Sequence, residues 1–409
     1  MRVLILYRHF WPDSPPYASM LRSIARRLSM DGHSITIICE QPCYKLADGE
    51  LECPNKEVLD GINVVRLPRL PFWNIDFVRA ISKFCFPFRS WLLCVARLSA
   101  KEPFDVIWTA TIPPVLSGYI GRKLAQKYNA KFIYHCQDLY PELAVHMKMI
   151  KERGVIHRVL MSVEKKTREK ADIVISLSGD MRATIRKLAD SPSGRLITLN
   201  NFLLEDFPDK DRKSVEIESS TVFSDTELVK IVFAGNIGQF QGLESVVEAV
   251  TKIDPNGKSV ELAFIGEGKA LQKLKSISKG ASNISFYPHM PFSIAKHIIA
   301  RADYGLVSLE AGIYQYAFPS KTLTYFGLSL PLLVVVEPRS ELAKHIKRER
   351  IGYCADSLEV SDIVSMLQNM LNSSEASEVR KQRVEEYYKE HCEREKILGI
   401  WSGLISDLH

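Results

Sequence analysis

The sequence predicts an α/β protein made of two doubly wound, Rossmann-like parallel-sheet domains. Short runs of β-branched and aromatic residues alternate with amphipathic helical stretches along most of the chain. The alternation is interrupted once, by a polar stretch over residues 206–227, and then starts again. The chain has 409 residues, which is more than one ordinary hydrophobic core holds.

The first half opens with a βαβ unit. A strand expected at Val3–Tyr7 leads through a Pro-rich loop into a helix, which stops at Asp31-Gly32 before a strand at Ile35–Cys39. Further short apolar runs follow at Val64–Leu67, Val106–Trp108, Phe132–Tyr134 and Ile173–Ile175. Runs of this kind are typical of strands buried on both faces, and the helices between them favour parallel pairing.

The second half repeats the pattern after the polar stretch. Strands are expected at Ile231–Ala234, Glu261–Ile265, Ile284–Tyr287, Gly305–Leu309 and Leu332–Val336, separated by helices such as Leu243–Val250. We therefore expect an N-terminal domain over residues 1–208 and a C-terminal domain over residues 209–383, with their carboxyl edges facing each other across a cleft. A final helix over 384–409 is expected to pack back on the first domain.

Composition limits the function classes. Hydrophobic residues make up 46% of the chain and charged residues 25%, as in soluble globular proteins. The net charge of +6 permits an anionic ligand or a membrane surface but does not demand nucleic acid. The eight cysteines form no CxxC pair and no metal-like cluster with histidine, so we expect a reducing cytoplasm, no disulfides and no metal site. We expect no signal peptide, because residues 2–7 already form a short strand that is followed by polar residues and prolines. We expect no membrane span, because no uninterrupted apolar run reaches roughly 18 residues.

Residues 72–98 combine many aromatic and aliphatic residues with interleaved Arg and Lys. This mixture suits the boundary between lipid headgroups and acyl chains, so it predicts peripheral docking on the inner face of the cytoplasmic membrane. The alternative is two ordinary amphipathic helices, broken at Pro87, whose basic residues are solvated.

Three motifs occur in the second half in a fixed order. The first is the glycine turn Gly235–Gly242, the second is the turn Gly266–Gly268, and the third is the segment Pro319–Gly327 with Ser320 and Lys321 near its start. Turns at the carboxyl ends of parallel strands are where ligands bind, and glycines there let backbone N–H groups approach a phosphate. Each turn alone is equally compatible with a plain strand-to-helix connection.

Taken together, the order and spacing of these motifs resemble glycosyltransferase family 4, and within it bacterial O-antigen and exopolysaccharide transferases with a "PSK" motif. Other segments agree with the same family from residue 1 to about 350: Trp11-Pro12, Gly32-His33, Asp138–Glu142, Ala171–Ser176 and Asn200-Asn201.

The resemblance implies a GT-B fold and a retaining transfer that needs no cofactor and no divalent metal. The implied partners are a nucleotide-sugar donor, with a UDP-sugar favoured, and a glycan acceptor on a polyprenyl diphosphate, as in surface polysaccharide synthesis. Alternatives are a soluble acceptor, a non-catalytic nucleotide-binding homologue, and a dinucleotide oxidoreductase. The last is disfavoured because the first strand-to-helix turn lacks GxGxxG.

The chain departs from the family where charged residues usually contact the diphosphate and ribose. Asn236 and Gln241 stand in the first turn where the family has Arg and Lys, and Thr324 and Tyr316 stand at or near the positions of two glutamates. Lys321 is the cation expected to compensate for these losses, by stabilising the negative charge that develops on the leaving diphosphate.

The resemblance and the strand order assign roles to individual residues. Expected catalytic residues are Lys321, Asp138 and His135; expected donor-binding residues are Gly235, Asn236, Gly238, Gln241, Gly266, Gly268, His289, Met290, Pro319, Ser320 and Thr324; expected acceptor-binding residues are Arg8, His9 and Glu142. Plainer roles remain open: a solvated Lys321, an Asp138 that caps the helix near Pro141, a core His135, and a loop at Arg8 without a ligand.

Overall fold

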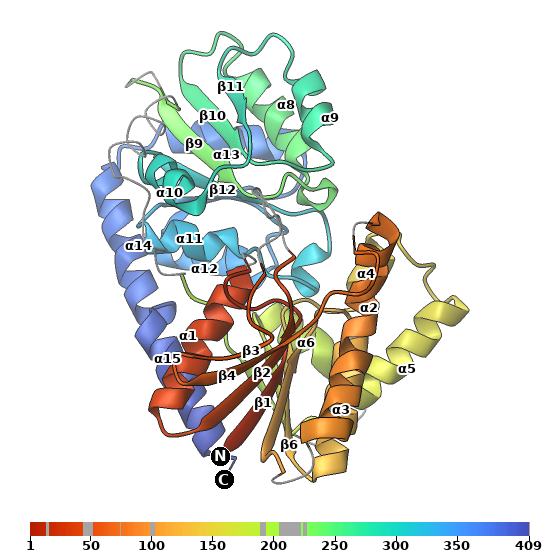
Figure 1. The fold of residues 1–409 in the computed structure, drawn as a ribbon. Coiled ribbons are helices and arrows are strands. Elements are labelled where there is room, and N and C mark those ends of the chain that lie inside the picture. The colour runs from red at the N-terminus through yellow and green to blue at the C-terminus, as the bar shows by residue number, and fades with distance from the viewer. Residues whose placement is uncertain are drawn as a thin grey trace. The chain divides into compact units, whose positions relative to one another are not determined.

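The computed structural model describes residues 1–13, 16–43, 52–73, 75–98, 103–188, 194–203, 222–223 and 227–408. The chain divides into two compact units (Figure 1). Unit 1 comprises residues 1–204, 316–318 and 394–409, and unit 2 comprises residues 205–315 and 319–393. The polar stretch expected to separate the domains, 206–227, lies almost entirely outside the described residues.

Unit 1 is built on one eight-stranded sheet with the order β3-β4-β2-β1-β5-β6-β7-β8. Its strands are β1 (Arg2–Leu6), β2 (Ser34–Glu40), β3 (Lys56–Leu59), β4 (Ile62–Leu67), β5 (Val106–Ala110), β6 (Lys131–Cys136), β7 (Ile173–Ser176) and β8 (Arg195–Thr198). All neighbours pair in parallel except β3 and β4, which form an edge hairpin that was not predicted. The dipeptide Asp60-Gly61 is the sequence signal for this hairpin, because Asp-Gly is typical of two-residue hairpin turns. Both residues have positive φ in the structure, as such a turn requires.

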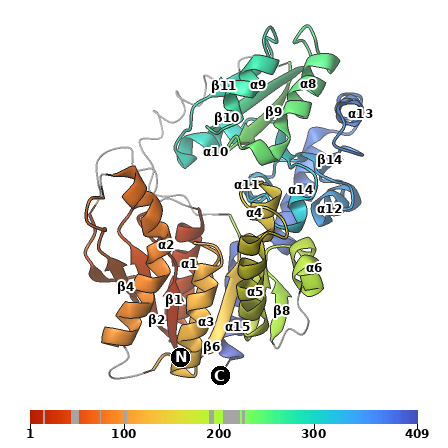
Figure 2. The ribbon, with the colours of Figure 1, turned by 90° about the vertical axis from the view of Figure 1, so that its right-hand side faces the viewer.

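Helices cover both faces of this sheet (Figure 2). They are α1 (Pro16–Met30), α2 (Asp76–Leu93) with a π-helical extension η1 (Cys94–Leu98), α3 (Leu116–Tyr128), α4 (Glu142–His146), α5 (Val155–Glu169), α6 (Gly179–Leu188) and α15 (Arg394–Ser406). Alternate residues of β1 enter two different cores: Val3 and Ile5 pack with α1 and α15, whereas Leu4 and Leu6 pack with α2 and α3. The period of two along each strand explains this division.

Unit 2 has a six-stranded, fully parallel sheet with the order β11-β10-β9-β12-β13-β14. Its strands are β9 (Val229–Ala234), β10 (Val260–Ile265), β11 (Ile284–Tyr287), β12 (Tyr304–Ser308), β13 (Leu332–Val335) and β14 (Gly352–Cys354). Its helices are η2 (Gln239–Gln241), α8 (Leu243–Ile253), α9 (Leu271–Ile277), α10 (Phe292–Ala300), η3 (Ile313–Gln315), α11 (Lys321–Gly327), α12 (Glu341–Glu349), α13 (Val360–Leu371) and α14 (Ser377–His391). The predicted architecture of two doubly wound α/β domains is confirmed.

Three details differ from expectation. The C-terminal segment forms two helices and not one: α14 belongs to unit 2, whereas α15 packs on α1, with Trp401 stacked on Trp108 at 4.3 Å between ring centroids. Pro87 lies inside α2 without ending it. Residues 316–318 belong to unit 1, where the N–H of Leu139 donates to the carbonyl oxygen of Tyr316 at 2.8 Å. Among the described residues, no helix has the length and hydropathy to cross a bilayer.

Candidate functional site

The two glycine turns of unit 2 form one structure at the carboxyl ends of β9 and β10. The N–H of Gly235 donates to the carbonyl oxygen of Ile265 at 2.9 Å, and the N–H of Ile237 donates to that of Glu267 at 2.8 Å. A Cβ atom on Gly266 would overlap the carbonyl oxygen of Gly235, and one on Gly268 would overlap that of Ile237. Glycine is therefore required in the second turn so that the first can lie directly against it.

This packing corrects one expectation about the backbone donors. The N–H of Gly235 is already used within the sheet, so it is not available to a ligand. The N–H groups of Asn236 and Gly238 donate to no acceptor among the described residues. Of the three expected donors at Gly235, Asn236 and Gly238, the last two are therefore open within the described part of the chain.

Lys321 lies beside the first glycine turn. Its Nζ stands 3.3 Å from the centre of the Phe233 ring and donates to Oε1 of Gln241 at 3.3 Å. The nearest atom to a Cβ built on Gly235 would be Cε of Lys321, at 3.9 Å. Gln241, the residue that replaces a family cation, thus contacts the cation expected to compensate for it.

The charge of Lys321 is not neutralised within the described part of the chain. No carboxylate of those residues forms an ion pair with its ammonium group. The residue as a whole is half-buried, with its Nζ turned onto the Phe233 ring. Desolvation lowers the pKa of Lys321 well below its usual value. A bound anion would supply the missing counter-ion and would favour the charged form of this lysine.

Tyr325 fixes the helix that carries Lys321. Its ring is fully buried, its hydroxyl accepts from the N–H of Ala234 at 3.0 Å, and it donates to the carbonyl oxygen of Val232 at 3.3 Å. These bonds tie α11 to the carboxyl end of strand β9. The hydroxyl of Ser308 donates to the backbone oxygen of Gln241 and holds the far end of the same loop. Neither residue is predictable from the sequence, because both bond to backbone atoms far away in sequence.

The remaining predicted donor residues lie around the same edge of the unit 2 sheet. His289 is exposed and Met290 half-buried; both follow β11, which pairs in parallel with β10. Pro319 and Thr324 are half-buried, and Ser320 is exposed immediately before α11. Carboxyl ends of parallel strands share one edge, so these residues and the glycine turns are on the same side of the sheet.

Asp138 follows β6 in unit 1. It forms a β-bridge with Ala317, and its N–H lies 3.4 Å from Oγ1 of Thr111. Desolvation raises the pKa of its carboxyl group to about 6. The alternative capping role is not found, because the N-cap of α4 is Pro141 and no side chain caps it. Asp138 thus has the raised pKa typical of functional carboxylates.

His135 has the environment of a core histidine. It is 1% exposed, and burial lowers its pKa to about 3. Its Nδ1 is 2.9 Å from the hydroxyl of Tyr17, and its Nε2 is 2.8 Å from the side-chain amide of Gln137. Both ring nitrogens therefore have partners inside unit 1, which favours a core histidine over a catalytic one.

Glu142 takes part in a buried ion-pair network. Arg168 donates to Glu142 at 2.8 Å and to Glu164 at 3.1 Å, and Glu164 accepts from the hydroxyl of Tyr134. All three charged side chains are less than one-tenth exposed. The carboxylate of Glu142 therefore has a structural partner that does not depend on an acceptor.

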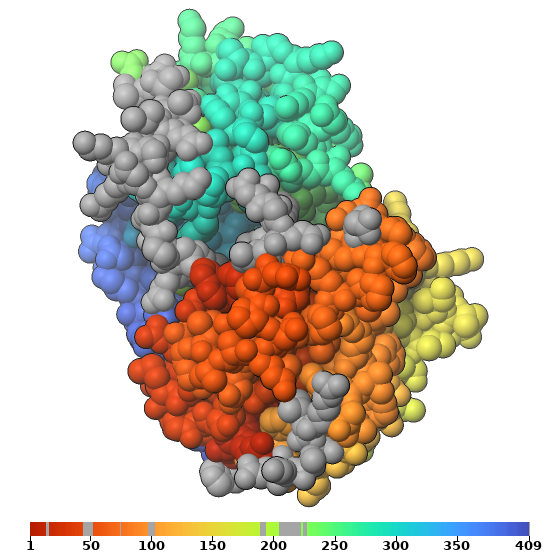
Figure 3. All heavy atoms as spheres, viewed as in Figure 1, coloured from red at the N-terminus to blue at the C-terminus, as the bar shows by residue number. Residues whose placement is uncertain are grey.

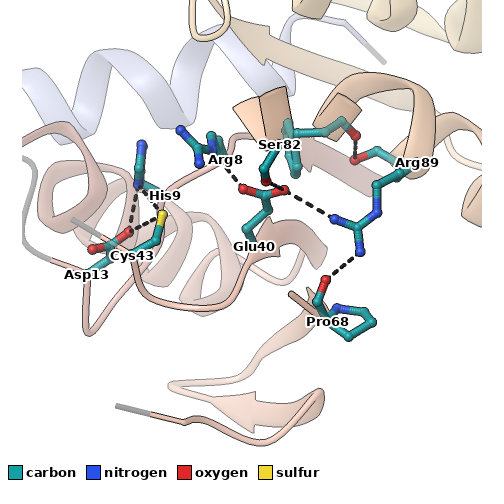
Figure 4. Close-up of polar contacts among 10 residues, drawn as sticks. Arg8, His9, Asp13, Glu40, Cys43, Pro68, Ser82 and Arg89 are labelled. Carbon is teal, nitrogen blue, oxygen red and sulfur yellow. Dashed lines mark hydrogen bonds and ion pairs between the residues drawn. The ribbon is translucent and has the colours of Figure 1, made fainter. Parts of the chain in front are cut away.

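The predicted acceptor residues Arg8 and His9 lie in the loop after β1 and point to different partners (Figure 4). Arg8 pairs with the buried Glu40 at 2.7 Å. His9 lies 2.6 Å from Oδ2 of Asp13, and Sγ of Cys43 is 3.9 Å from Nδ1 of His9. The expectation that no cysteine joins a histidine cluster is wrong here, because strand pairing unites two loops that are distant in sequence.

Comparisons with known proteins support the family that the motifs resemble. Residues 17–201 match the family described as the glycosyl transferase 4-like domain. The chain is 22% identical over 331 residues to the probable glycosyltransferase WbjE of Pseudomonas aeruginosa, covering 78% of this chain and 80% of that protein. It is 19% identical over 408 residues to the putative colanic acid biosynthesis glycosyl transferase WcaI of Escherichia coli strain K12, covering 97% and 98%. The branch with the PSK motif is not resolved by these matches.

Solved structures establish the fold as GT-B. Sucrose-phosphate synthase from Thermosynechococcus elongatus matches with a TM-score of 0.72 and 16% identity, covering 100% of this chain and 98% of that one. Anabaena Alr3699/HepE in complex with UDP-glucose matches with a TM-score of 0.67 and 10% identity, covering 100% of both chains.

Proposed function

We propose that this chain is a retaining glycosyltransferase that moves a sugar from a nucleotide-sugar, preferentially a UDP-sugar, to a glycan carried on a polyprenyl diphosphate. The product would be a bacterial surface polysaccharide such as O-antigen, capsule or exopolysaccharide. The matches to WbjE and WcaI support a glycosyltransferase of the GT-B type. A structural neighbour crystallised with UDP-glucose supports the choice of donor.

The observation that carries the proposal is Lys321 beside the glycine turn, whose ammonium group forms no ion pair with any carboxylate of the described residues. Breaking the bond between the sugar and the diphosphate leaves negative charge on the phosphate oxygen. In this chain, Lys321 and the open N–H groups of Asn236 and Gly238 supply positive charge and hydrogen bonds for that oxygen. A lysine in this place supplies charge that a divalent metal supplies in other transferases, so we propose that the step needs no metal.

The anomeric configuration is retained if the acceptor hydroxyl attacks the anomeric carbon from the same face that the diphosphate leaves. The new bond forms between the acceptor oxygen and the anomeric carbon, the old carbon–oxygen bond breaks, and the hydroxyl proton goes to the departing phosphate oxygen. No protein nucleophile is then needed. Asp138, with its pKa near neutrality, orients the acceptor or stabilises the positive charge on the sugar.

The acceptor's lipid places the enzyme on a membrane surface, and α2 has a face that suits this. Five of its apolar residues recur at helical spacing on the outside of the helix: Phe77, Ile81, Phe84, Phe88 and Leu92, with Phe77 70% exposed. The helix lies at the orange surface of unit 1 in Figure 3. The basic residues Arg79 and Lys83 belong to the same helix, and anionic lipids would attract them.

A second apolar face strengthens the membrane proposal. Helix α5 exposes Val155, Ile156 and Val159, and α2, α3 and α5 lie side by side on one side of the unit 1 sheet (Figure 2). Co-sedimentation with anionic liposomes tests this: Phe77→Ser with Phe84→Ser should lower the bound fraction several-fold. Val58→Ser, an equally exposed apolar residue on β3, should leave it unchanged. Equal binding by all variants would remove the membrane from the proposal.

A donor panel tests the reaction itself. The protein is incubated with UDP- and GDP-sugars and a membrane extract containing lipid-linked glycans, and release of the nucleoside diphosphate is followed. We expect one donor to be used well above the others, with release that depends on the extract. Release that depends on a soluble acceptor would favour that alternative, and stabilisation by UDP without any turnover would favour a nucleotide-binding homologue.

A further inference from the structure

We propose that His9, Asp13 and Cys43 form a binding site for a divalent transition-metal ion of the zinc class in unit 1. Nδ1 of the histidine, a carboxylate oxygen of the aspartate and Sγ of the cysteine all lie within 4.8 Å of one another. Figure 4 shows the three side chains converging from two loops, while Arg8 turns away toward Glu40. The inference does not rest on the proposed transfer reaction.

The fold brings these residues together through strand pairing. His9 and Asp13 follow β1 and Cys43 follows β2, two parallel neighbours in which Leu6 is opposite Ile38. The backbone of both loops is tied down, since the N–H of Glu40 donates to the carbonyl oxygen of Arg8 at 2.9 Å and that of Asp13 to Phe10 at 2.9 Å. The donor atoms are therefore held in place by the sheet edge and not by the loops alone.

The distances suit a tetrahedral ion. Ligand bonds of about 2.0–2.3 Å at tetrahedral angles place N, O and S donors roughly 3.3–3.6 Å from one another. The observed separations are 2.6 Å between His9 and Asp13, 3.9 Å between His9 and Cys43, and 4.0 Å between Asp13 and Cys43. Each differs from the tetrahedral value by less than about 1 Å, which small side-chain rotations can close.

The donor types select the metal. Imidazole and thiolate favour zinc over magnesium or calcium, which prefer oxygen ligands. His9 is 8% exposed and Asp13 1%, so charge balance matters here. A doubly charged ion would be balanced by one carboxylate and one thiolate, with the thiol proton released to solvent on binding. Three protein ligands leave a fourth position open to water.

The neighbouring cation does not compete with the metal. Arg8 is held by Glu40 at 2.7 Å, and Glu40 also accepts from Ser82 at 2.7 Å and from Arg89 at 3.3 Å. The carboxylate of Glu40 thus links Arg8 to Ser82 and Arg89 of α2 and keeps the charge of Arg8 paired.

Metal content of the full chain, purified without a histidine tag, tests the inference. After loading with Zn²⁺ and exhaustive dialysis, elemental analysis should find about one zinc per chain in the wild type. Cys43→Ser and Asp13→Asn should each lower zinc retention at least about tenfold. The control Cys85→Ser changes a half-exposed cysteine of the same unit and should retain it fully. Zinc retained equally by wild type and Cys43→Ser would overturn the proposal.

Cobalt gives a second readout that reports the ligands directly. A thiolate bound to Co²⁺ produces a charge-transfer absorption, expected in the wild type and in Cys85→Ser but not in Cys43→Ser. Circular dichroism of the metal-free proteins checks that each variant is folded. Absence of the absorption in a folded, cobalt-loaded wild type would also overturn the proposal. Neither experiment requires a sugar donor, so failure here is distinguishable from failure of the proposed transfer reaction.

Discussion

Replacing Lys321 by Met should lower kcat about 100-fold or more. The ammonium group stands 3.3 Å from the centre of the Phe233 ring and has no carboxylate partner in the described part of the chain, so the diphosphate is its natural counter-ion. Loss of one preorganised charge-stabilising donor costs roughly 10²–10³ in kcat. A factor of 100 corresponds to about 2.7 kcal/mol of transition-state stabilisation.

The same substitution should stabilise the protein in the absence of donor. Desolvation lowers the pKa of Lys321 in the folded state below its usual value of 10.5, so the folded chain binds this proton more weakly than the unfolded chain. The resulting cost to stability is fully present below the folded-state pKa and disappears as pH rises from that pKa to the unfolded value. At neutral pH, Lys321→Met removes this cost and keeps an apolar contact with the aromatic ring.

Two assays check this prediction. Initial rates of nucleoside diphosphate release at saturating donor give kcat, and urea unfolding gives the free energy of unfolding with and without UDP. Lys344→Met, which removes an exposed lysine on α12 of the same unit, is the matched control and should change neither value. A fall in kcat of less than about threefold, in a variant shown to be folded, would refute the role given to Lys321.

Three further substitutions test other parts of the structure. Gly268→Ala should weaken UDP binding strongly and lower the melting temperature, because its Cβ would overlap the carbonyl oxygen of Ile237. The control Gly403→Ala has no atom near its Cβ and should leave the melting temperature unchanged or raise it slightly. Equal effects of the two substitutions would contradict the packing of the turns. Asp138→Asn should gain stability relative to wild type as pH rises from about 4 to about 7, because the wild-type carboxyl gives up its proton near pH 4 when unfolded but only near pH 6 when folded. A pH-independent difference in urea unfolding would show that the carboxyl is not desolvated. Arg168→Met should lower the free energy of unfolding in urea by about 3–5 kcal/mol, because the buried carboxylates of Glu142 and Glu164 lose their partner. A decrease below about 1 kcal/mol would mean that these carboxylates are solvated.

Local sequence patterns predicted the fold and the glycine turns well. Strand and helix periods and the glycines at strand ends depend on neighbouring residues, so both sheets and the turn at Gly235 were visible in advance. The edge hairpin at β3 was missed although Asp60-Gly61 marked it. The continuity of α2 through Pro87 was not foreseen, and nothing in the structure explains it.

Contacts between distant segments were not predictable from one sequence. Gln241 and Lys321 are 80 residues apart, and their contact depends on how α11 packs under β9. The cluster of His9 with Cys43 depends on the register of two strands. Glu142 looked like an acceptor residue because it follows a strand, but its partner is Arg168 on α5.

Transfer with product analysis tests the central claim most directly. The enzyme is incubated with the preferred nucleotide-sugar, of known anomeric configuration, and the lipid-linked acceptor fraction; mass spectrometry then measures the added sugar and NMR its linkage. We predict an acceptor one sugar heavier, with the donor's anomeric configuration retained and with product formation abolished in Lys321→Met. Inversion of the anomeric centre, or no transfer from any nucleotide-sugar to any lipid-linked acceptor by folded protein, would contradict the account.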